Sequence, residues 1–437
     1  MKRFGIIFLL AILVLAYLLR AHNLYTWPRK GATFDEYAWT WQGINLIKQK
    51  VPISWSPHKQ YKNAKSVIYQ KTHFRIVEPY LEHPPLFGLI AGSYALLNGA
   101  DDMFDVDIVN IRGLAVILGL LSLIFFFMLL REVFDDNTAV LGSILYATIP
   151  SVVVGSRLVQ NENFFIPFWL LSLFLVARYL KNGTAWYRNL AAVICGLLVL
   201  AKIPWVAAAL SIVLIFLFLR KYKDLTKFLL IFVPIAFLFF VYGIYYDKEL
   251  FLSLWGLQLN RYDISFASLY AVFLKPFLTD RLYLDGWIYF GWFSTILLFL
   301  KDIKKNLFIV FPFLAYFLVF LAGIPDEAGH GWYRYPFFPF LIASTTLFIK
   351  EYFIKNRLLT FVFLVLVGTT LFQLTWANVF GFSYFMFRII IVGWIICLLP
   401  LFLNSKKITK ISNVVSYGWL LIFILMNIWA VTLYNEQ

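Results

Sequence analysis

The sequence predicts an all-α polytopic membrane protein that crosses the bilayer about 13 times. Of its 437 residues, 62% are hydrophobic and only 14% are charged, whereas about a quarter of the residues in a soluble domain are charged. Apolar runs recur from end to end, each about 15 to 20 residues long and so close to the length that a helix needs to cross the hydrocarbon. Lys and Arg gather in the short loops between these runs, as they do on the cytoplasmic side of membrane proteins.

The first apolar run, residues 4–19, follows Lys2 and Arg3 as the core of a signal peptide would. We expect a retained helix, because no small-residue cleavage site follows it and further apolar runs do. Cys195 and Cys397 both fall inside expected spans, so neither a disulfide framework nor a thiolate metal site is expected. The net charge of +15 is attributed to topology rather than to nucleic-acid binding.

One short apolar segment decides the number of crossings. As a helix, residues 84–98 would extend only about 22 Å, against the roughly 30 Å of the hydrocarbon core. We therefore expect this segment to lie along the membrane surface. The spans are then expected at 4–21, 112–131, 137–155, 163–180, 189–203, 204–219, 228–246, 284–300, 307–323, 336–349, 358–376, 386–403 and 414–433.

This assignment places the basic clusters on one side of the membrane, which the distribution of Lys and Arg identifies as the cytoplasm. The N-terminus is then cytoplasmic and the C-terminus lies outside. The expected location is the inner (plasma) membrane of a prokaryotic cell, with the active site facing the periplasm or cell exterior. The clusters are Lys2/Arg3, Arg178/Lys181/Arg188, Arg220/Lys221/Lys223/Lys227, Lys301/Lys304/Lys305, Lys350/Lys355/Arg357 and Lys406/Lys407/Lys410.

Three outer segments stand apart from the short loops, at 22–111, 247–283 and 324–335. Loops of such length usually carry function. We expect residues 1–220, with the first outer loop, to form a catalytic module and residues 221–437 a variable C-terminal module.

Within the first outer loop, residues 34–50 place Tyr37, Trp41, Ile44 and Ile47 on one helical face. That spacing suits a helix lying in the headgroup region, with Trp at the boundary.

Acidic residues are expected at two places on the outer face. Asp35 and Glu36 follow the first span where the chain leaves the bilayer, and Glu162 lies in the turn between spans 137–155 and 163–180. A carboxyl group at a dry boundary has a raised pKa or holds a cation, as a general base or metal ligand requires. We expect these three residues to be catalytic. The alternatives are a solvated surface pair and a helix-capping Glu.

A second group combines acids with histidines. Glu82 and His83 precede two prolines that fix the backbone at the start of segment 84–98, and His330 lies with two acids in loop 324–335. We expect Glu82 and His83 to contact substrate, or else to be structural. Together with His330, they are candidate ligands for a divalent metal ion, although their spacing does not match a known coordination pattern. No other cofactor is expected.

Basic residues at the outer boundary are expected to bind phosphate, because a phosphate leaving group needs positive charge where its own charge develops. Lys202 interrupts an apolar stretch at the outer end of a helical hairpin. Arg261 and Arg334 are similarly placed, and Arg157 belongs to the polar turn that contains Glu162. We expect these cations, together with Tyr335 beside Arg334, to bind an anionic, amphipathic substrate. The alternative for each cation is a snorkelling anchor at the interface.

In their order and spacing, these residues resemble the multispanning glycosyltransferases of the GT-C class. The nearest families are the protein O-mannosyltransferases of glycosyltransferase family 39 and the transferases that add aminoarabinose to lipid A. The likeness is strongest over residues 1–220. It is carried by Asp35-Glu36, Glu82-His83-Pro84-Pro85-Leu86, Glu162, Lys202 and Arg334-Tyr335.

The resemblance implies a catalytic Asp in the first outer loop, which is Asp35 here, and horizontal helices in that loop. Glu162 occupies a place where these enzymes often have Asp. The aminoarabinose enzymes have Lys where this chain has His83, so its His-Pro-Pro form is nearer to the mannosyltransferase branch.

The sequence thus predicts a glycosyltransferase that moves a sugar from a polyprenyl-phosphate carrier to an acceptor hydroxyl on the outer face of the membrane. The acceptor is a protein, a lipid or a glycan, and no nucleic acid is expected. One alternative is a transporter or flippase for a lipid-linked sugar, which would have ionisable residues near the midplane. The spans here carry almost none. The other alternative is a non-catalytic subunit of the cell envelope, which would not need Asp35.

Overall fold

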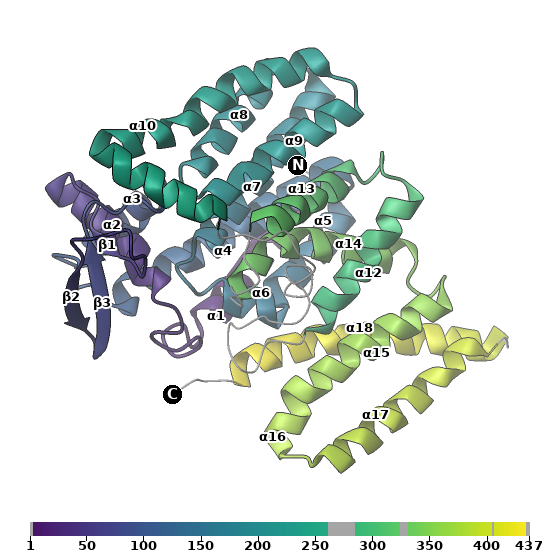
Figure 1. The fold of residues 1–437 in the computed structure, drawn as a ribbon. Coiled ribbons are helices and arrows are strands. Elements are labelled where there is room, and N and C mark those ends of the chain that lie inside the picture. The colour runs from purple at the N-terminus through teal and green to yellow at the C-terminus, as the bar shows by residue number, and fades with distance from the viewer. Residues whose placement is uncertain (1–2, 261–284, 324–330, 404–405, 434–437) are drawn as a thin grey trace.

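The computed structural model describes residues 3–260, 285–323, 331–403 and 406–433, and its helices follow the apolar runs of the sequence (Figure 1). Each expected span overlaps a helix, and α13 has the expected bounds. Three spans differ more: 137–155 is divided into Asp136–Thr148 and Pro150–Gly155, 228–246 lies within the longer helix Tyr222–Asn260, and the helix of 414–433 already begins at Lys406. The helices outside the first loop are α1 (Arg3–Ala21), α4 (Ile108–Val133), α5 (Asp136–Thr148), α6 (Pro150–Gly155), α7 (Asn161–Asn182), α8 (Ala185–Val199), α9 (Val206–Phe218), α10 (Tyr222–Asn260), α12 (Gly286–Lys301), α13 (Leu307–Gly323), α14 (Phe338–Glu351), α15 (Arg357–Phe372), α16 (Asn378–Phe380), α17 (Tyr384–Leu398) and α18 (Lys406–Leu433).

Short turns of tighter or wider helix connect some of these elements. They are the 3-10 turns η1 (Ile203–Trp205), η2 (Gly331–Phe337) and η4 (Leu399–Phe402), and the π-helical turn η3 (Gln373–Ala377).

The chain is a multi-pass membrane protein. Among the described residues, six helices are long and apolar enough to cross a bilayer, and six shorter apolar helices accompany them. The expected number of about 13 crossings and their orientation stay predictions. The six long helices are Ile108–Val133, Asn161–Asn182, Tyr222–Asn260, Arg357–Thr375, Tyr384–Phe402 and Ile408–Leu433.

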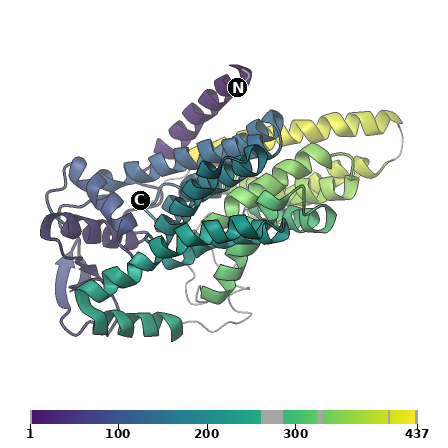
Figure 2. The ribbon, with the colours of Figure 1, turned by 90° about the horizontal axis from the view of Figure 1, so that it is seen from above.

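The first outer loop is folded, and it contains a small sheet that the all-α prediction missed. Its strands β1 (Ser54–Trp55), β2 (Lys65–Tyr69) and β3 (Thr72–Val77) are antiparallel, in the order β1-β3-β2. Figure 2 shows this sheet and the helices of the loop together at one end of the helical bundle.

The two helices of this loop, α2 (Asp35–Gln49) and α3 (Leu86–Leu97), pack closely against each other. Glycines make the approach possible, because a Cβ atom on Gly43 would lie 1.8 Å from the carbonyl oxygen of Gly88. The 12 residues of α3 are too few to cross the hydrocarbon. The segment that was expected at the membrane surface is therefore a helix paired with α2.

Helix α10 bends sharply at Asp247, whose φ and ψ of −163° and 102° are not helical. After the bend, Phe251 and Leu254 pack against the first loop, in a cluster with Tyr80 and Leu81. The expected outer loop 247–283 is thus helical as far as Asn260, and its remaining residues lie outside the described part of the chain.

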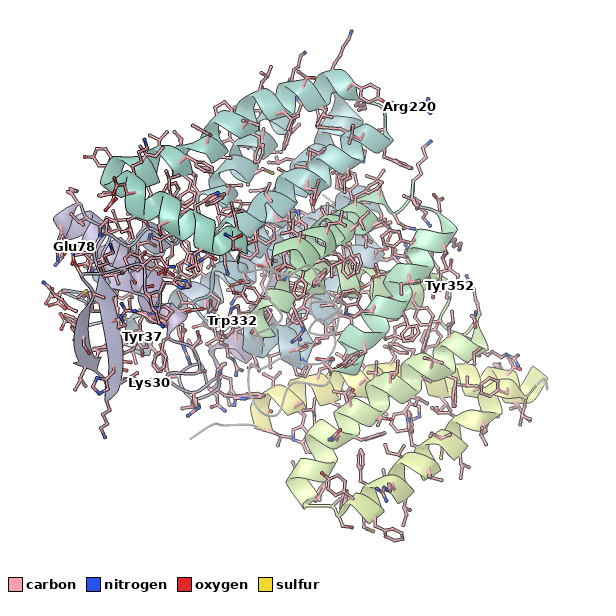
Figure 3. The ribbon with its side chains drawn as sticks, viewed as in Figure 1. Lys30, Tyr37, Glu78, Arg220, Trp332 and Tyr352 are labelled. Carbon is pink, nitrogen blue, oxygen red and sulfur yellow. The ribbon has the colours of Figure 1, made fainter. Side chains whose placement is uncertain are left out.

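Ion pairs gather at the end of the bundle opposite the first loop. Arg178 contacts Glu132 at 3.1 Å, Arg188 contacts Asp224 at 3.1 Å, and Lys350 pairs with Asp135. Figure 3 shows Arg220, another residue of the basic clusters, far from Tyr37 of α2. The helical bundle therefore separates a basic, ion-paired end from the end that carries the first loop.

Candidate active site

Asp35 is the first residue of α2 and lies half-buried at the loop end of the bundle. Its backbone N–H donates to Thr33 Oγ1 at 3.2 Å, and Gln160 hydrogen-bonds its side chain. Burial raises the pKa of the Asp35 carboxyl to about 6; the charge of Lys202 opposes this rise and that of Glu162 adds to it. A carboxyl group with this pKa is ionised at neutral pH and can still accept a proton.

Glu162 and Lys202 form a buried ion pair beside Asp35. The distance from Lys202 Nζ to Glu162 Oε1 is 2.8 Å, and the two side chains are 8% and 0% exposed, respectively. The ammonium group also lies 4.7 Å from the ring centroid of Tyr333 and 5.4 Å from that of Trp205. Aromatic faces stabilise a cation that has lost its water, so the pair is held from η1, η2 and the start of α7.

Glu36 turns away from Asp35 and pairs with Arg112. Arg112 Nη2 lies 3.0 Å from Glu36 Oε2, Arg112 Nε lies 3.2 Å from Oε1, and the backbone N–H of Val159 donates to Oε1 at 3.0 Å. Both side chains are fully buried. The remaining Arg112 donors reach the carbonyl oxygens of Leu24, Pro28 and Arg29. This pair ties α2 to α4 and to the turn before α7.

Arg157 is fully buried and binds backbone rather than a carboxylate. Its Nη1 donates to the carbonyl oxygen of Trp27 at 2.8 Å and its Nη2 to that of Leu19 at 2.7 Å. Leu19 lies in the last turn of α1, where unpaired carbonyls concentrate negative charge that a cation stabilises. Arg157 therefore fastens the segment before α7 to the end of α1.

Glu82 and His83 lie against α2 and the loop before β2. The carboxylate of Glu82 is 3.4 Å from His58 Nε2. The carbonyl oxygen of His83 accepts a hydrogen bond from Gln42 Nε2 at 3.2 Å, and the imidazole ring of His83 lies 4.7 Å from the Trp39 ring, centroid to centroid.

The described residues contain no group of three or more His, Cys, Asp or Glu that could hold a metal ion. His330, the third residue considered for a metal, lies outside the described ranges, as does Arg261.

Arg334 and Tyr335 lie in η2 and are both largely buried. The Tyr335 ring packs on Gly155 so closely that a Cβ there would lie 2.6 Å from it. Burial raises the pKa of the Tyr335 hydroxyl far above its usual range, and the charges of Glu162 and Glu36 act in the same direction. Tyr335 is thus close to both acids. Trp332, from the same turn and labelled near the middle of Figure 3, is buried as well.

The structure brings together four of the residues selected from the sequence, namely Asp35, Glu162, Lys202 and Tyr335. Sequence reasoning missed Arg112, which starts an apolar run and reads as an interface anchor. It also missed Gln160, although Gln160 belongs to the polar turn that contains Glu162. That turn was the available signal, because polar side chains are costly there unless they are paired or used.

A family model described as dolichyl-phosphate-mannose-protein mannosyltransferase matches residues 82–246. No curated protein matches the sequence.

Solved membrane enzymes share the fold over nearly the whole chain. The structure of ArnT from Cupriavidus metallidurans bound to undecaprenyl phosphate aligns with a TM-score of 0.58 and 14% identity, covering 99% of this chain and 78% of ArnT. The oligosaccharyltransferase AglB from Archaeoglobus fulgidus, in complex with an inhibitory peptide and a dolichol-phosphate, aligns with a TM-score of 0.57 and 14% identity.

That second alignment covers 100% of this chain and 57% of AglB, so the chain spans little more than half the length of the oligosaccharyltransferase. The chain therefore has the fold of the GT-C class of polytopic membrane glycosyltransferases, and its residues 82–246 resemble the protein mannosyltransferases.

Proposed function

We propose that the protein transfers a sugar from a polyprenyl-phosphate carrier to an acceptor hydroxyl at the outer face of the membrane. The observation that carries this proposal is the position of Asp35 beside the buried Glu162–Lys202 pair, with a pKa of about 6. The match to a mannosyltransferase family and the fold shared with an enzyme that was solved with undecaprenyl phosphate support it.

In the proposed reaction, Asp35 accepts the proton of the acceptor hydroxyl as the hydroxyl oxygen attacks the anomeric carbon of the donor. A new carbon–oxygen bond forms there, and the bond from that carbon to the carrier's phosphate oxygen breaks. The polyprenyl phosphate leaves with the electron pair. Lys202 and Arg334 supply positive charge for the leaving group, and Arg261 is a further candidate.

Glu36, Arg112 and Arg157 serve as positioning residues in this proposal. Their side chains are fully buried, and the two arginines donate hydrogen bonds to Glu36 and to backbone carbonyls. They fix the start of α2 and the turn before α7, which carry Asp35 and Glu162. Small displacements of such groups lower rates strongly, because proton transfer requires hydrogen-bond distance.

The wider organisation is also a proposal. Residues 1–220 would form the catalytic module and residues 221–437 the variable module, in an inner membrane with the first loop facing the periplasm or cell exterior. Glu82 and His83 would contact substrate. With His330, they remain the candidates for a divalent metal ion.

The deciding experiment measures the release of polyprenyl phosphate from a panel of polyprenyl-phosphate sugars, with purified protein in membranes and an acceptor-rich extract present. The wild type is compared with a folded Asp35→Asn variant. Release by the wild type alone supports the proposal and identifies the donor. Absence of release from every donor would favour the transporter or the non-catalytic subunit, and equal release by both proteins would remove Asp35 from the mechanism.

A further inference from the structure

Three buried polar atoms around the turn before α7 have no hydrogen-bond partner among the residues that the structure describes. They are Gln160 Oε1, Glu162 Oε2 and the hydroxyl of Tyr335. Gln160 and Glu162 are 0% exposed and Tyr335 is 2% exposed. Burying a polar group without a partner destabilises the fold, so native structures rarely retain such a group unless a ligand or a water molecule hydrogen-bonds it.

The three residues lie around one turn: Gln160 and Glu162 are at the start of α7, and the Tyr335 ring packs on Gly155 at the end of α6. Gln160 Nε2 donates to Thr33 Oγ1 at 3.0 Å, and the same hydroxyl accepts from the backbone N–H of Asp35. The charge of Glu162 acts on both Asp35 and Tyr335. Gln160 and Glu162 therefore place unsatisfied polar groups beside the proposed base, and Tyr335 lies close to Glu162.

The chemistry of these atoms restricts what can bind them. An amide oxygen and a carboxylate oxygen only accept hydrogen bonds, whereas a tyrosine hydroxyl can donate or accept. A ligand must therefore present hydrogen-bond donors to Gln160 and Glu162. Lys202 already neutralises Glu162 at 2.8 Å, so uncharged O–H groups are sufficient donors. A carboxylate in the same place would face two acceptor oxygens.

We propose that Gln160, Glu162 and Tyr335 bind hydroxyl groups of the transferred sugar, and that this sugar is a neutral polyhydroxylated one rather than a uronic acid. This inference rests on the proposed function, because it assigns a donor to the same site. It makes these three side chains determinants of sugar specificity, in addition to the role of Glu162 as the partner of Lys202.

The sharpest variant is Tyr335→Phe, because it removes an atom that has no partner among the described residues and keeps the ring that packs on Gly155. Tyr146→Phe is the control, since Tyr146 is 3% exposed and lies in α5, where its backbone carbonyl accepts from Arg20. Release of polyprenyl phosphate is measured with a neutral hexosyl donor, the corresponding hexuronosyl donor and a series of mono-deoxy hexosyl donors.

The wild type should use the neutral donor at least about a hundredfold better than the uronosyl donor. Tyr335→Phe should raise KM for the neutral donor about three- to tenfold, the effect of one lost hydrogen bond, whereas Tyr146→Phe should leave KM unchanged. With the wild type, one mono-deoxy donor should show a KM raised by a similar factor. With Tyr335→Phe, the KM of that donor should equal the KM of the full hexosyl donor, because the two changes remove the same contact.

Equal use of the uronosyl donor would overturn the inference. The inference would also be overturned if Tyr335→Phe and each mono-deoxy change raised KM by independent factors, since water rather than the sugar would then hydrogen-bond the buried atoms. Both results leave the proposed function intact. Failure of the wild type to release polyprenyl phosphate from any donor would instead refute the proposed function, and the inference with it.

Discussion

At the scale of single residues, the ionisation of Asp35 determines how activity should depend on pH. Burial raises the pKa of this carboxyl to about 6, and only the ionised form can accept a proton. We expect kcat/KM to rise with pH through 6, and at pH 5 to be about a tenth of its plateau value. A pH–rate profile on a donor that the enzyme accepts tests this. An inflection near 4, the ordinary range of an exposed carboxyl, would contradict it.

The same raised pKa has a consequence for stability. The folded chain binds the Asp35 proton more tightly than the unfolded chain, so this group's contribution to stability falls as pH rises from about 4 to about 6. Asp35→Asn carries no such charge and should raise Tm relative to wild type at pH 7. The difference should vanish below pH 4. Thermal unfolding in detergent at the two pH values measures it, and an equal difference at both would show that ionisation is not the cause.

The Glu36–Arg112 pair should stabilise the fold strongly, because both partners are fully buried. Removing one partner leaves an uncompensated buried charge, so Glu36→Gln should lower the free energy of unfolding by about 3 kcal/mol. Lys30→Gln is the matched control, since the Lys30–Asp107 pair has a similar length of 2.8 Å but is 43% and 41% exposed. It should cost less than about 1 kcal/mol. Equal falls in Tm for the two variants would argue against a structural role for the buried pair.

Sequence reasoning could select carboxylates and cations by their position at span ends, but it could not pair them. Glu36 and Arg112 are 76 positions apart in the chain. Nothing in the hydropathy of residues 34–50 indicates that Glu36 faces Arg112 while Asp35 faces Lys202. That division depends on how α2 is rotated about its axis, which only the packing of α2 against α3 and α4 determines.

At the scale of elements, the helices could be predicted because each needs a long apolar run, and such runs are plain in the sequence. The hairpin of β2 and β3 could not, because its turn lacks the usual signal. Gln70 and Lys71 both adopt positive φ, at 48° and 64°, in a turn where Asn-Gly or Asp-Gly is preferred. The bend of α10 at Asp247 was hidden for a related reason, since no proline or glycine occupies that position.

The contact between α2 and α3 should be intolerant of even one added methyl group. A Cβ on Gly43 would meet the backbone of Gly88, which cannot rotate away as a side chain can. Gly43→Ala should therefore cost about 2 kcal/mol and displace the helix that carries Asp35. We expect a lower Tm and a kcat reduced by at least about tenfold.

Gly418→Ala is the control for this substitution, because a Cβ on Gly418, within α18, meets nothing within 4 Å. Alanine favours helix over glycine by about 1 kcal/mol, so this variant should be as stable as wild type or more so. A tolerated Gly43→Ala with wild-type activity would show that α2 and α3 can separate without harm to the site.

At the scale of the whole molecule, the basic clusters predicted from the positive-inside rule meet acids at one end of the bundle. Glu132 receives Arg178 and Lys181, and Glu351 receives Lys301 and Lys305. These pairs are exposed enough to contribute little stability individually. They mark instead an unequal distribution of charge along the bundle, with excess positive charge at one end and the first loop at the other.

This polarity predicts which end faces the cytoplasm. Ser66, in the exposed strand β2, and Thr184, in the exposed turn between α7 and α8, mark opposite ends of the bundle. Each is replaced by cysteine in a chain that also carries Cys397→Ser, because Cys397 is exposed and would itself be labelled, whereas Cys195 is buried. In intact cells, a membrane-impermeant maleimide should label Ser66→Cys and should label Thr184→Cys only after permeabilisation. Labelling of Thr184→Cys alone in intact cells would place Asp35 on the cytoplasmic side. It would then require a donor presented from the cytoplasmic leaflet, even if the chemistry at Asp35 were unchanged.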